Sequence, residues 1–262
     1  MIRSELKRYL RQPVADDDKY SRGVVGFITG SVEYPGAAIL GVTAAMRTGI
    51  GMVRYLGPRS VGELLLQTRP EAVLNDGKAQ SWVFGSGVPT DSADIGFMQE
   101  HFELSDLSVI DAGAIEILDL RARTGLAVLT PHAGELARLL AVSKDDVLSD
   151  PTKFAAMAAA VTDCVVLLKG HTSYLATPEG ELRGLANLSS ALSTAGTGDV
   201  LAGILGALLA ANHDAALENA FVDLLELGVQ LHSAAAEYAA KNGPIAALDV
   251  AEAVRFVIAE TK

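Results

Sequence analysis

The segment Ser193-Thr-Ala-Gly-Thr-Gly-Asp199 is followed at once by the apolar run Val200-Leu-Ala-Gly-Ile-Leu-Gly-Ala-Leu-Leu-Ala-Ala211. The run predicts a long apolar helix over Asp199–Ala211. Its start presents unpaired backbone N–H groups and the positive end of the helix dipole. The glycines before it let the backbone approach a bound group closely. Together these features predict a pocket for a phosphate or another anion.

Asp199 is the unusual member of this segment, because a carboxylate repels an anion. It could simply cap the helix, and the glycines could belong to a plain tight turn. A base, or an electrostatic partner of a metal–nucleotide complex, explains the acid better. We therefore favour phosphate chemistry at this segment.

Bulk composition limits the classes of partner. The chain has 262 residues, of which 50% are hydrophobic, so it can bury a large core as one α/β domain. A net charge of −11 argues against binding to nucleic acid or to an anionic membrane. Phosphates would have to be held by local dipoles, local cations or a metal. The one cysteine, Cys164, excludes an internal disulfide and is expected to be a packed, inert thiol.

No apolar run is long enough for a bilayer, since the longest is Val200–Ala211. The start of the chain is basic but lacks the apolar core of a signal peptide. We therefore expect a cytoplasmic protein, with one domain over residues 1–262 and an N-terminal helix or arm over 1–19.

Short apolar runs alternate with longer amphipathic ones. The predicted strands are Gly23–Thr29, Met52–Leu56, Trp82–Phe84, Leu107–Asp111, Leu126–Thr130 and Cys164–Leu168, and then a hairpin of Thr172–Ala176 with Glu181–Leu185. The predicted helices are Gly36–Arg47, Val61–Thr68, Asp91–Phe102, Gly134–Leu140, Pro151–Val161, Asp199–Ala211, Ala215–Lys241 and Asp249–Glu260. This alternation predicts a mostly parallel sheet covered by helices on both faces, a three-layer α/β/α fold.

Polar and glycine-containing segments follow most of these strands. They are Gly30-Ser31, Gly85-Ser-Gly87, Asp111-Ala-Gly113, Thr130-Pro-His132 and Lys169-Gly170. Ligands of such sheets bind in the crevice beyond the carboxyl ends of the strands. The sequence therefore predicts one site built from these segments and Asp199.

Two of the segments allow both a structural and a functional interpretation. Thr130-Pro-His-Ala-Gly-Glu135 could be a capped helix start, or could place His132 against the substrate and let Glu135 hold Mg²⁺ through water. In Lys169-Gly-His-Thr-Ser173, the lysine could be an exposed strand end or could meet a nucleotide phosphate, with Gly170 providing room.

Other motifs and histidines add little. By itself His171 is expected at the surface, whereas His101, His213 and His232 are expected to be structural or exposed. Walker A, Gly-x-Gly-x-x-Gly, His-Glu-x-x-His and Gly-x-Ser-x-Gly patterns are absent from the sequence.

From about Tyr20 onward, the chain resembles the ADP-dependent NAD(P)H-hydrate dehydratases of the ribokinase-like superfamily. The resemblance rests on four segments in order: Gly85-Ser-Gly87, Thr130-Pro-His-Ala-Gly-Glu135, Lys169-Gly-His-Thr-Ser173 and Ala195-Gly-Thr-Gly-Asp199. It implies a repair reaction on the S epimer of hydrated NADH and NADPH. The added hydroxyl is phosphorylated by ADP, and loss of phosphate restores the ring double bond.

The resemblance also implies roles for individual residues. Asp199 would act at the substrate hydroxyl, and Gly196, Thr197 and Gly198 would stabilise the transferring phosphate. Ala38, Gly87 and His132 would contact the hydrated dinucleotide. The adenine nucleotide would contact Lys169, Gly170, His171, Thr172, Ser173 and Gly198. Mg²⁺ would bridge the phosphates, and relatives often assemble as tetramers.

Two alternative functions fit part of the pattern. A ribokinase-like kinase of a vitamin precursor, such as a thiazole alcohol, would also use Asp199, but Thr130–Glu135 argues against it. A nucleotide-binding module without turnover would not need to retain Asp199 between its glycines and the helix.

Overall fold

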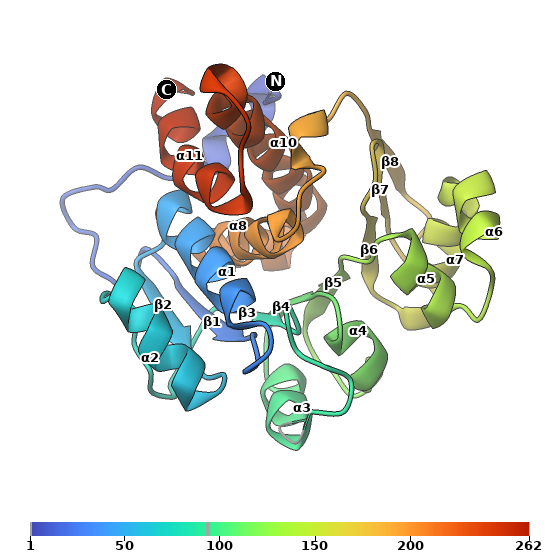
Figure 1. The fold of residues 1–262 in the computed structure, drawn as a ribbon, viewed down its shortest axis with the longest axis horizontal. Coiled ribbons are helices and arrows are strands. Elements are labelled where there is room, and N and C mark those ends of the chain that lie inside the picture. Colours follow the sequence, from blue (N-terminus) through green and yellow to red (C-terminus); the bar gives the residue numbers. More distant parts are fainter. Residues whose placement is uncertain (1, 93–94, 262) are drawn as a thin grey trace.

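The computed structural model describes residues 2–92 and 95–261, and it contains one eight-stranded sheet with helices on both faces (Figure 1). The strands are β1 (Val24–Ile28), β2 (Met52–Tyr55), β3 (Ser81–Phe84), β4 (Leu107–Ile110), β5 (Leu126–Leu129), β6 (Val165–Leu168), β7 (Ser173–Ala176) and β8 (Leu182–Leu185). Their order is β2-β1-β3-β4-β5-β6-β7-β8. The first six are parallel, and β7 and β8 form the predicted antiparallel hairpin.

The central strands are buried on both faces, which explains their continuous apolar sequence. In β3, for example, Val83 belongs to one hydrophobic cluster, whereas Trp82 and Phe84 belong to another. The first cluster joins the sheet to α1 (Pro35–Thr48), α8 (Thr197–Ala211), α10 (Phe221–Ala239) and α11 (Ala247–Glu260). The second joins it to α3 (Ile95–Glu103), α4 (Ala114–Ile117), α5 (Ala133–Leu139) and α7 (Pro151–Thr162). The predicted three-layer α/β/α arrangement is confirmed.

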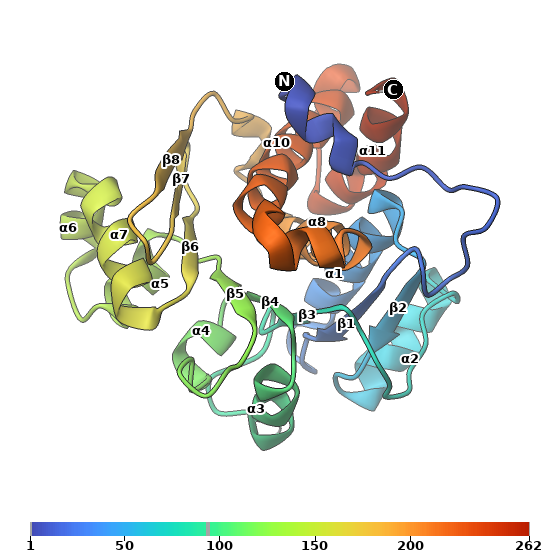
Figure 2. The same ribbon diagram turned by 180° about the vertical axis from the view of Figure 1, so that it is seen from behind.

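The remaining short elements complete the layers. They are α2 (Arg59–Thr68), α6 (Lys144–Ser149) and α9 (His213–Ala215), a π-helical turn at Ala216–Ala220, and short 3₁₀ helices at Ser4–Tyr9, Ser190–Leu192 and Ala240–Asn242. The 3₁₀ helix Ser4–Tyr9 lies in the segment predicted as a helix or arm. It is held by buried Leu6 and by an ion pair of 2.8 Å between Arg3 and Glu226 of α10. Both chain ends lie beside α10 and α11 (Figures 1 and 2).

Several predicted boundaries are wrong. Helices α4 and α6 were not predicted, because each is only one to two turns long. Asp91 lies in a turn, residues 93–94 are outside the described chain, and α3 begins at Ile95. The predicted helix Ala215–Lys241 is divided, since α10 is preceded by the π turn and followed by a 3₁₀ turn.

Cys164 is buried just before β6, as expected of a packed thiol, and burial raises its pKa to about 11.

Among the described residues no single helix is both long and apolar enough to cross a membrane. One bent pair, Thr197–Ala211 with His213–Ala239, passes that test of length and composition when the two are taken together.

Helices α1 and α8 touch through their glycines. A Cβ on Gly203 of α8 would collide with the carbonyl oxygen of Gly41 on α1, and a Cβ on Gly41 would lie 3.3 Å from the carbonyl oxygen of Asp199. This contact fixes the depth at which α8 lies in the core, and so it fixes the position of its first turn.

We expect Gly203→Ala to lower the free energy of unfolding by about 1–3 kcal/mol, because the added methyl group has no space between the two helices. Urea unfolding of the purified variant measures this change. The matched control is Gly36→Ala in α1, whose Cβ would meet nothing within 4 Å. Equal stability of the two variants would contradict the proposed close contact.

Candidate functional site

The first turn of α8 is open to a ligand. The helix begins at Thr197, two residues before the predicted start, and its N-cap residue Gly196 has a left-handed backbone with φ of 89°. No side chain among the described residues caps this helix end, so Asp199 does not serve as its cap. The first N–H groups of a helix lack intrahelical acceptors, and here they remain available for an anion.

The residues before Asp199 shape this turn. A Cβ on Gly196 would lie 2.6 Å from Leu40 Cδ1 and 3.7 Å from Asp199 Oδ2, so a side chain has no room there. The Thr197 hydroxyl donates hydrogen bonds to the carbonyl oxygens of Leu192 at 2.8 Å and Thr194 at 3.0 Å. Because this hydroxyl holds the preceding loop, only the backbone of Thr197 is left to face a ligand.

Lys169 brings positive charge to the same turn. Its Nζ would lie 3.3 Å from a Cβ on Gly198, and it donates a hydrogen bond of 2.7 Å to Asp111 Oδ1. Burial opposes the charge of this ammonium group, but the carboxylates of Asp111 and Glu135 act against burial and keep the pKa of Lys169 above its usual value. Lys169 is therefore a fixed cation, as phosphate binding requires.

Asp199 has the properties of a base. Burial of its carboxyl group and the nearby charge of Asp111 raise the pKa of Asp199 to about 7, although Lys169 acts in the opposite direction. A base is most effective when its pKa lies near the working pH. A carboxyl group that only stabilised the fold would gain nothing from this shift.

His132 and Glu135 form a reciprocal cap on α5. The His132 Nδ1 accepts hydrogen bonds from the N–H groups of Gly134 at 3.0 Å and Glu135 at 3.2 Å, while Glu135 Oε2 accepts from the His132 N–H at 2.8 Å. The structural interpretation of this motif is therefore confirmed. It does not exclude the functional one, because an Nδ1 that accepts two hydrogen bonds leaves the proton on Nε2.

The two interpretations of Thr130–Glu135 coexist because the motif lies beside the lysine. His132 and Lys169 form an isolated parallel bridge, and the Lys169 N–H donates to the Pro131 carbonyl oxygen at 2.8 Å. The end of β5 and the end of β6 thus present His132, Glu135 and Lys169 at one edge of the sheet.

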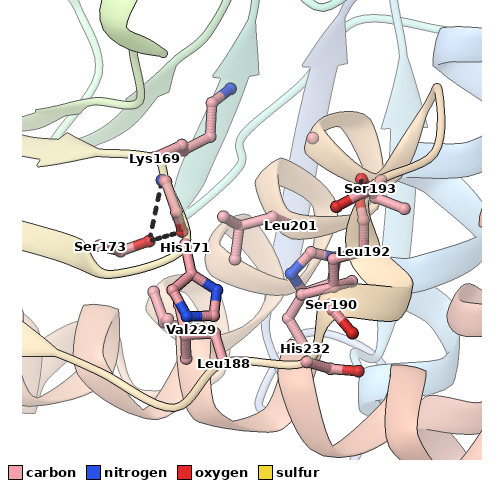
Figure 3. A pocket seen from close by; sticks show the side chains of 14 residues that line it. Lys169, His171, Ser173, Leu188, Ser190, Leu192, Ser193, Leu201, Val229 and His232 are labelled. Carbon is pink, nitrogen blue, oxygen red and sulfur yellow. Dashed lines mark hydrogen bonds between the residues drawn. The ribbon is translucent and has the colours of Figure 1, made fainter. Parts of the chain in front are cut away.

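A cavity of about 340 Å³ lies on one side of this edge (Figure 3). Its polar wall comes from the β6–β7 turn and the start of α8, and its apolar wall comes from α8, α10 and the loop before α8. The lining includes Lys169, Gly170, His171, Ser173, Thr197, Gly198, Leu188, Leu192, Leu201 and Val229. Most of the residues predicted to bind the adenine nucleotide are therefore together, and exposed His171 is one of them.

The other predicted site residues lie outside this cavity. Thr172 lines a neighbouring hollow of about 230 Å³, which shares Lys169, Gly170 and His171 with the cavity. Gly87 packs on the first turn of α1, where its Cβ would lie 2.6 Å from Ala37 Cβ, and Ala38 is fully buried there. His132, Glu135 and Asp199 are likewise absent from the cavity lining. The residues predicted for the second substrate thus lie outside the cavity, with Gly87 and Ala38 at the first turn of α1 and His132 at the end of β5.

The sequence did not reveal His232 as a site residue. It lies on α10, is only 5% exposed and lines the cavity, where its Nε2 has no hydrogen-bond partner within the described chain. Burial and the charge of Lys169 lower its pKa to about 3, so the ring is neutral. Its spacing from Leu225, Gly228 and Val229 places it on the core face of α10, so the sequence indicates a core position but not the cavity.

The protein side chains alone do not form a metal centre. Within residues 2–92 and 95–261, no group of three or more His, Cys, Asp or Glu side chains is arranged to hold an ion. Mg²⁺ is often held by one or two carboxylates together with substrate phosphates. Glu135 could supply one such carboxylate, although its side chain is only 10% exposed and its Oε1 lies 3.4 Å from His132 Nε2.

The fold and this site define a three-layer α/β/α protein with an open helix start beside a half-buried acid, Asp199. The chain belongs to the NAD(P)H-hydrate dehydratase family, whose model matches residues 25–255. Among solved structures, an ADP/ATP-dependent NAD(P)H-hydrate dehydratase from Bacillus subtilis, co-crystallized with ATP/Mg²⁺, has a TM-score of 0.86 at 24% identity. The match covers 99% of this chain and 98% of that one.

Relatives of known name agree with this family. The ADP-dependent (S)-NAD(P)H-hydrate dehydratase of Neisseria meningitidis is 32% identical over 88% of this chain and 82% of its own length. The bifunctional NAD(P)H-hydrate repair enzyme Nnr of Corynebacterium glutamicum is 36% identical over 77% of this chain, but over only 38% of its own length. The chain thus spans less than half the length of that bifunctional relative.

We expect Asp199→Asn to stabilise the protein at pH 8. The folded-state pKa of Asp199, about 7, lies above its ordinary value of 3.8, so the folded state loses stability as pH rises through this interval. Asparagine removes that loss, which is at most about 4 kcal/mol and is reduced by partial exposure of the group. Urea unfolding at pH 8 and pH 4 measures the difference, which should disappear at pH 4. A variant less stable than wild type at pH 8 would contradict this account.

Proposed function

We propose that the chain is an ADP-dependent (S)-NAD(P)H-hydrate dehydratase, which returns the S epimer of hydrated NADH and NADPH to the reduced cofactors. The observation that carries the proposal is the position of Asp199. Its carboxyl group has a pKa near 7 and belongs to the first turn of α8, whose start has no side-chain cap and whose Gly198 lies beside the Lys169 ammonium group. Family membership supports the choice of substrate.

The proposed reaction has two steps. Asp199 takes the proton of the substrate hydroxyl while its oxygen forms a bond to the β-phosphorus of ADP, and the bond to the AMP oxygen breaks. The carbon–oxygen bond of the phosphorylated hydroxyl then breaks, inorganic phosphate leaves with the bonding electrons, a proton leaves the neighbouring carbon, and the ring double bond is restored. Phosphoryl transfer depends on positioning and on charge stabilisation, which the amides of Gly196, Thr197 and Gly198 and the Lys169 cation would supply.

The two substrates approach from different sides of α8. The adenine nucleotide would occupy the cavity and contact Lys169, Gly170, His171, Ser173 and Gly198 there, and it would reach Thr172 only from the neighbouring hollow. Gly87 and His132 would contact the hydrated nicotinamide nucleotide, with the His132 Nε2–H as a hydrogen-bond donor. Ala38 was also predicted as a contact, but it is fully buried and could shape this site only from beneath. When bound, Mg²⁺ would neutralise phosphate charge, and Glu135 would hold it through water.

We also propose a cytoplasmic location and a homo-oligomer, a tetramer as in many relatives of this family. The acidic net charge of −11 supports a partner set of small molecules rather than nucleic acid or membrane.

A small-molecule kinase shares the fold, since the hydroxyethylthiazole kinase of Pyrococcus horikoshii has a TM-score of 0.67 at 17% identity. The assay below separates that function from dehydration.

Incubation of the protein with hydrated NADH, ADP and Mg²⁺ should restore the absorbance of reduced nicotinamide and release phosphate. Asp199→Asn should reduce kcat by at least about 100-fold, as expected for loss of a positioned base, while binding of ADP is kept. Absorbance at the reduced-nicotinamide band and a phosphate assay are followed together.

The matched control is Asp214→Asn, which removes a fully exposed acid in α9. It should leave kcat unchanged. Stable phosphorylation of a thiazole alcohol without recovery of NADH would identify a kinase, and nucleotide binding with no turnover would identify a binding module. Either result would overturn the proposed function.

A further inference from the structure

One buried carboxylate of the site has no role in the proposed reaction. Asp111 follows β4 and is 2% exposed, and it accepts three side-chain hydrogen bonds. The donors are Ser86 Oγ at 2.8 Å, Thr130 Oγ1 at 2.7 Å and Lys169 Nζ at 2.7 Å. They follow β3, β5 and β6 respectively, so one carboxylate joins the carboxyl ends of four adjacent parallel strands.

A contribution to stability does not by itself explain why the charged carboxylate of Asp111 is buried. Taking two ions out of water costs so much that a buried ion pair is often no better than apolar packing. Hydrogen bonds from Ser86 and Thr130 satisfy the oxygens of Asp111, and the ion pair with Lys169 balances its charge. The arrangement therefore secures the orientation of Lys169 rather than merely filling space.

Lys169 has two other acidic neighbours that could attract it. The charges of Glu135 and Asp199 both act on its ammonium group. An ion pair between Lys169 and Asp199 would remove the positive charge from the nucleotide side and would stabilise the ionised acid, which makes it a weaker base. The ammonium instead bonds Asp111 and lies beside Gly198.

We propose that Asp111 is the positioning residue of the site, and that its carboxylate holds the Lys169 ammonium against the first turn of α8 and away from Asp199. This inference rests on the proposed function for its catalytic consequence. Its structural part, a lysine aligned to meet the terminal phosphate of the nucleotide, applies to binding of ADP even without turnover.

The charges around Asp199 predict a specific change in pH dependence. Asp111 from β4 and Lys169 from β6 act on Asp199 directly, Glu135 from α5 acts on Lys169, and His232 from α10 is neutral. Replacing Asp111 by asparagine removes a negative charge and frees the lysine to approach Asp199. Both changes lower the pKa of the base.

We expect Asp111→Asn to shift the acidic limb of the kcat/KM profile from near pH 7 to lower pH by at least one unit. At pH 8, kcat should fall at least tenfold and the dissociation constant of ADP should rise at least fivefold. Thermal unfolding monitors the fold in the same buffers. A lower melting temperature with an unchanged acidic limb and unchanged ADP affinity would show a purely structural role and overturn the proposal.

Two further variants test the route through Lys169. Ser86→Ala removes one neutral hydrogen bond from Asp111 but leaves both charges, so the acidic limb should stay within about 0.3 unit of wild type. In a Lys169→Met background, Asp111→Asn should change ADP affinity less than twofold, because residues that act through one contact are not additive. This double variant also avoids an unpaired buried cation. A full fivefold loss in the Lys169→Met background would contradict the proposal.

Calorimetric titration with ADP and Mg²⁺ separates this inference from the proposed function. If the wild type does not restore NADH, the proposed function fails, while weaker ADP binding by Asp111→Asn still supports the positioning role. If the wild type restores NADH but Asp111→Asn keeps its ADP affinity and pH profile, only the positioning role is wrong.

Discussion

The structure depends on the way in which α8 enters the core. Gly196 adopts a left-handed backbone that side-chain-bearing residues rarely tolerate, and Leu40 and Ala247 lie against the position where its side chain would be. Further along α8, Gly203 packs directly against the backbone of Gly41 on α1. These contacts aim the first turn of an almost fully buried helix at the carboxyl edge of the sheet. The open start of α8 therefore follows from core packing.

The two acidic side chains near that turn have different pKa values and different roles. Asp111 and Asp199 lie near each other, but their surroundings differ. Asp111 accepts hydrogen bonds from Lys169, Thr130 and Ser86, and these bonds keep the pKa of Asp111 below its ordinary value despite burial. Burial and the charge of Asp111 raise the pKa of Asp199 to about 7. Two acids with pKa values pushed apart by their surroundings are typical of sites that need one fixed charge and one proton acceptor.

Most of the fold could be predicted because its strands are short apolar runs and its helices are long. The parallel direction of strands β1–β6 follows from the alternation of strand and helix, but their order in the sheet, with β2 at the edge, does not. The missed helices, α4 and α6, have only four and six residues, too few for a helical period to be visible. The π turn before α10 also escaped prediction, because Ala216–Ala220 has the composition of an ordinary helix.

The site was predictable where motifs end a strand, and less so elsewhere. Lys169, His132 and Gly198 were found because each stands in a short polar segment between regular elements. His232 was not, since it lies among apolar residues of a long helix and reaches the cavity only through tertiary packing. The reciprocal bond of His132 with the α5 backbone depends on a rotamer, which no spacing of residues encodes.

The open amides at the start of α8 have a consequence for the chemistry of the surrounding solution. Backbone N–H groups recognise tetrahedral oxyanions by geometry and charge, with little regard to what the phosphorus or sulfur carries. Under the proposed function, inorganic phosphate and sulfate would therefore compete with nucleotides for this helix end. The occupancy of the site would then follow the free phosphate concentration as well as the adenine nucleotide pool.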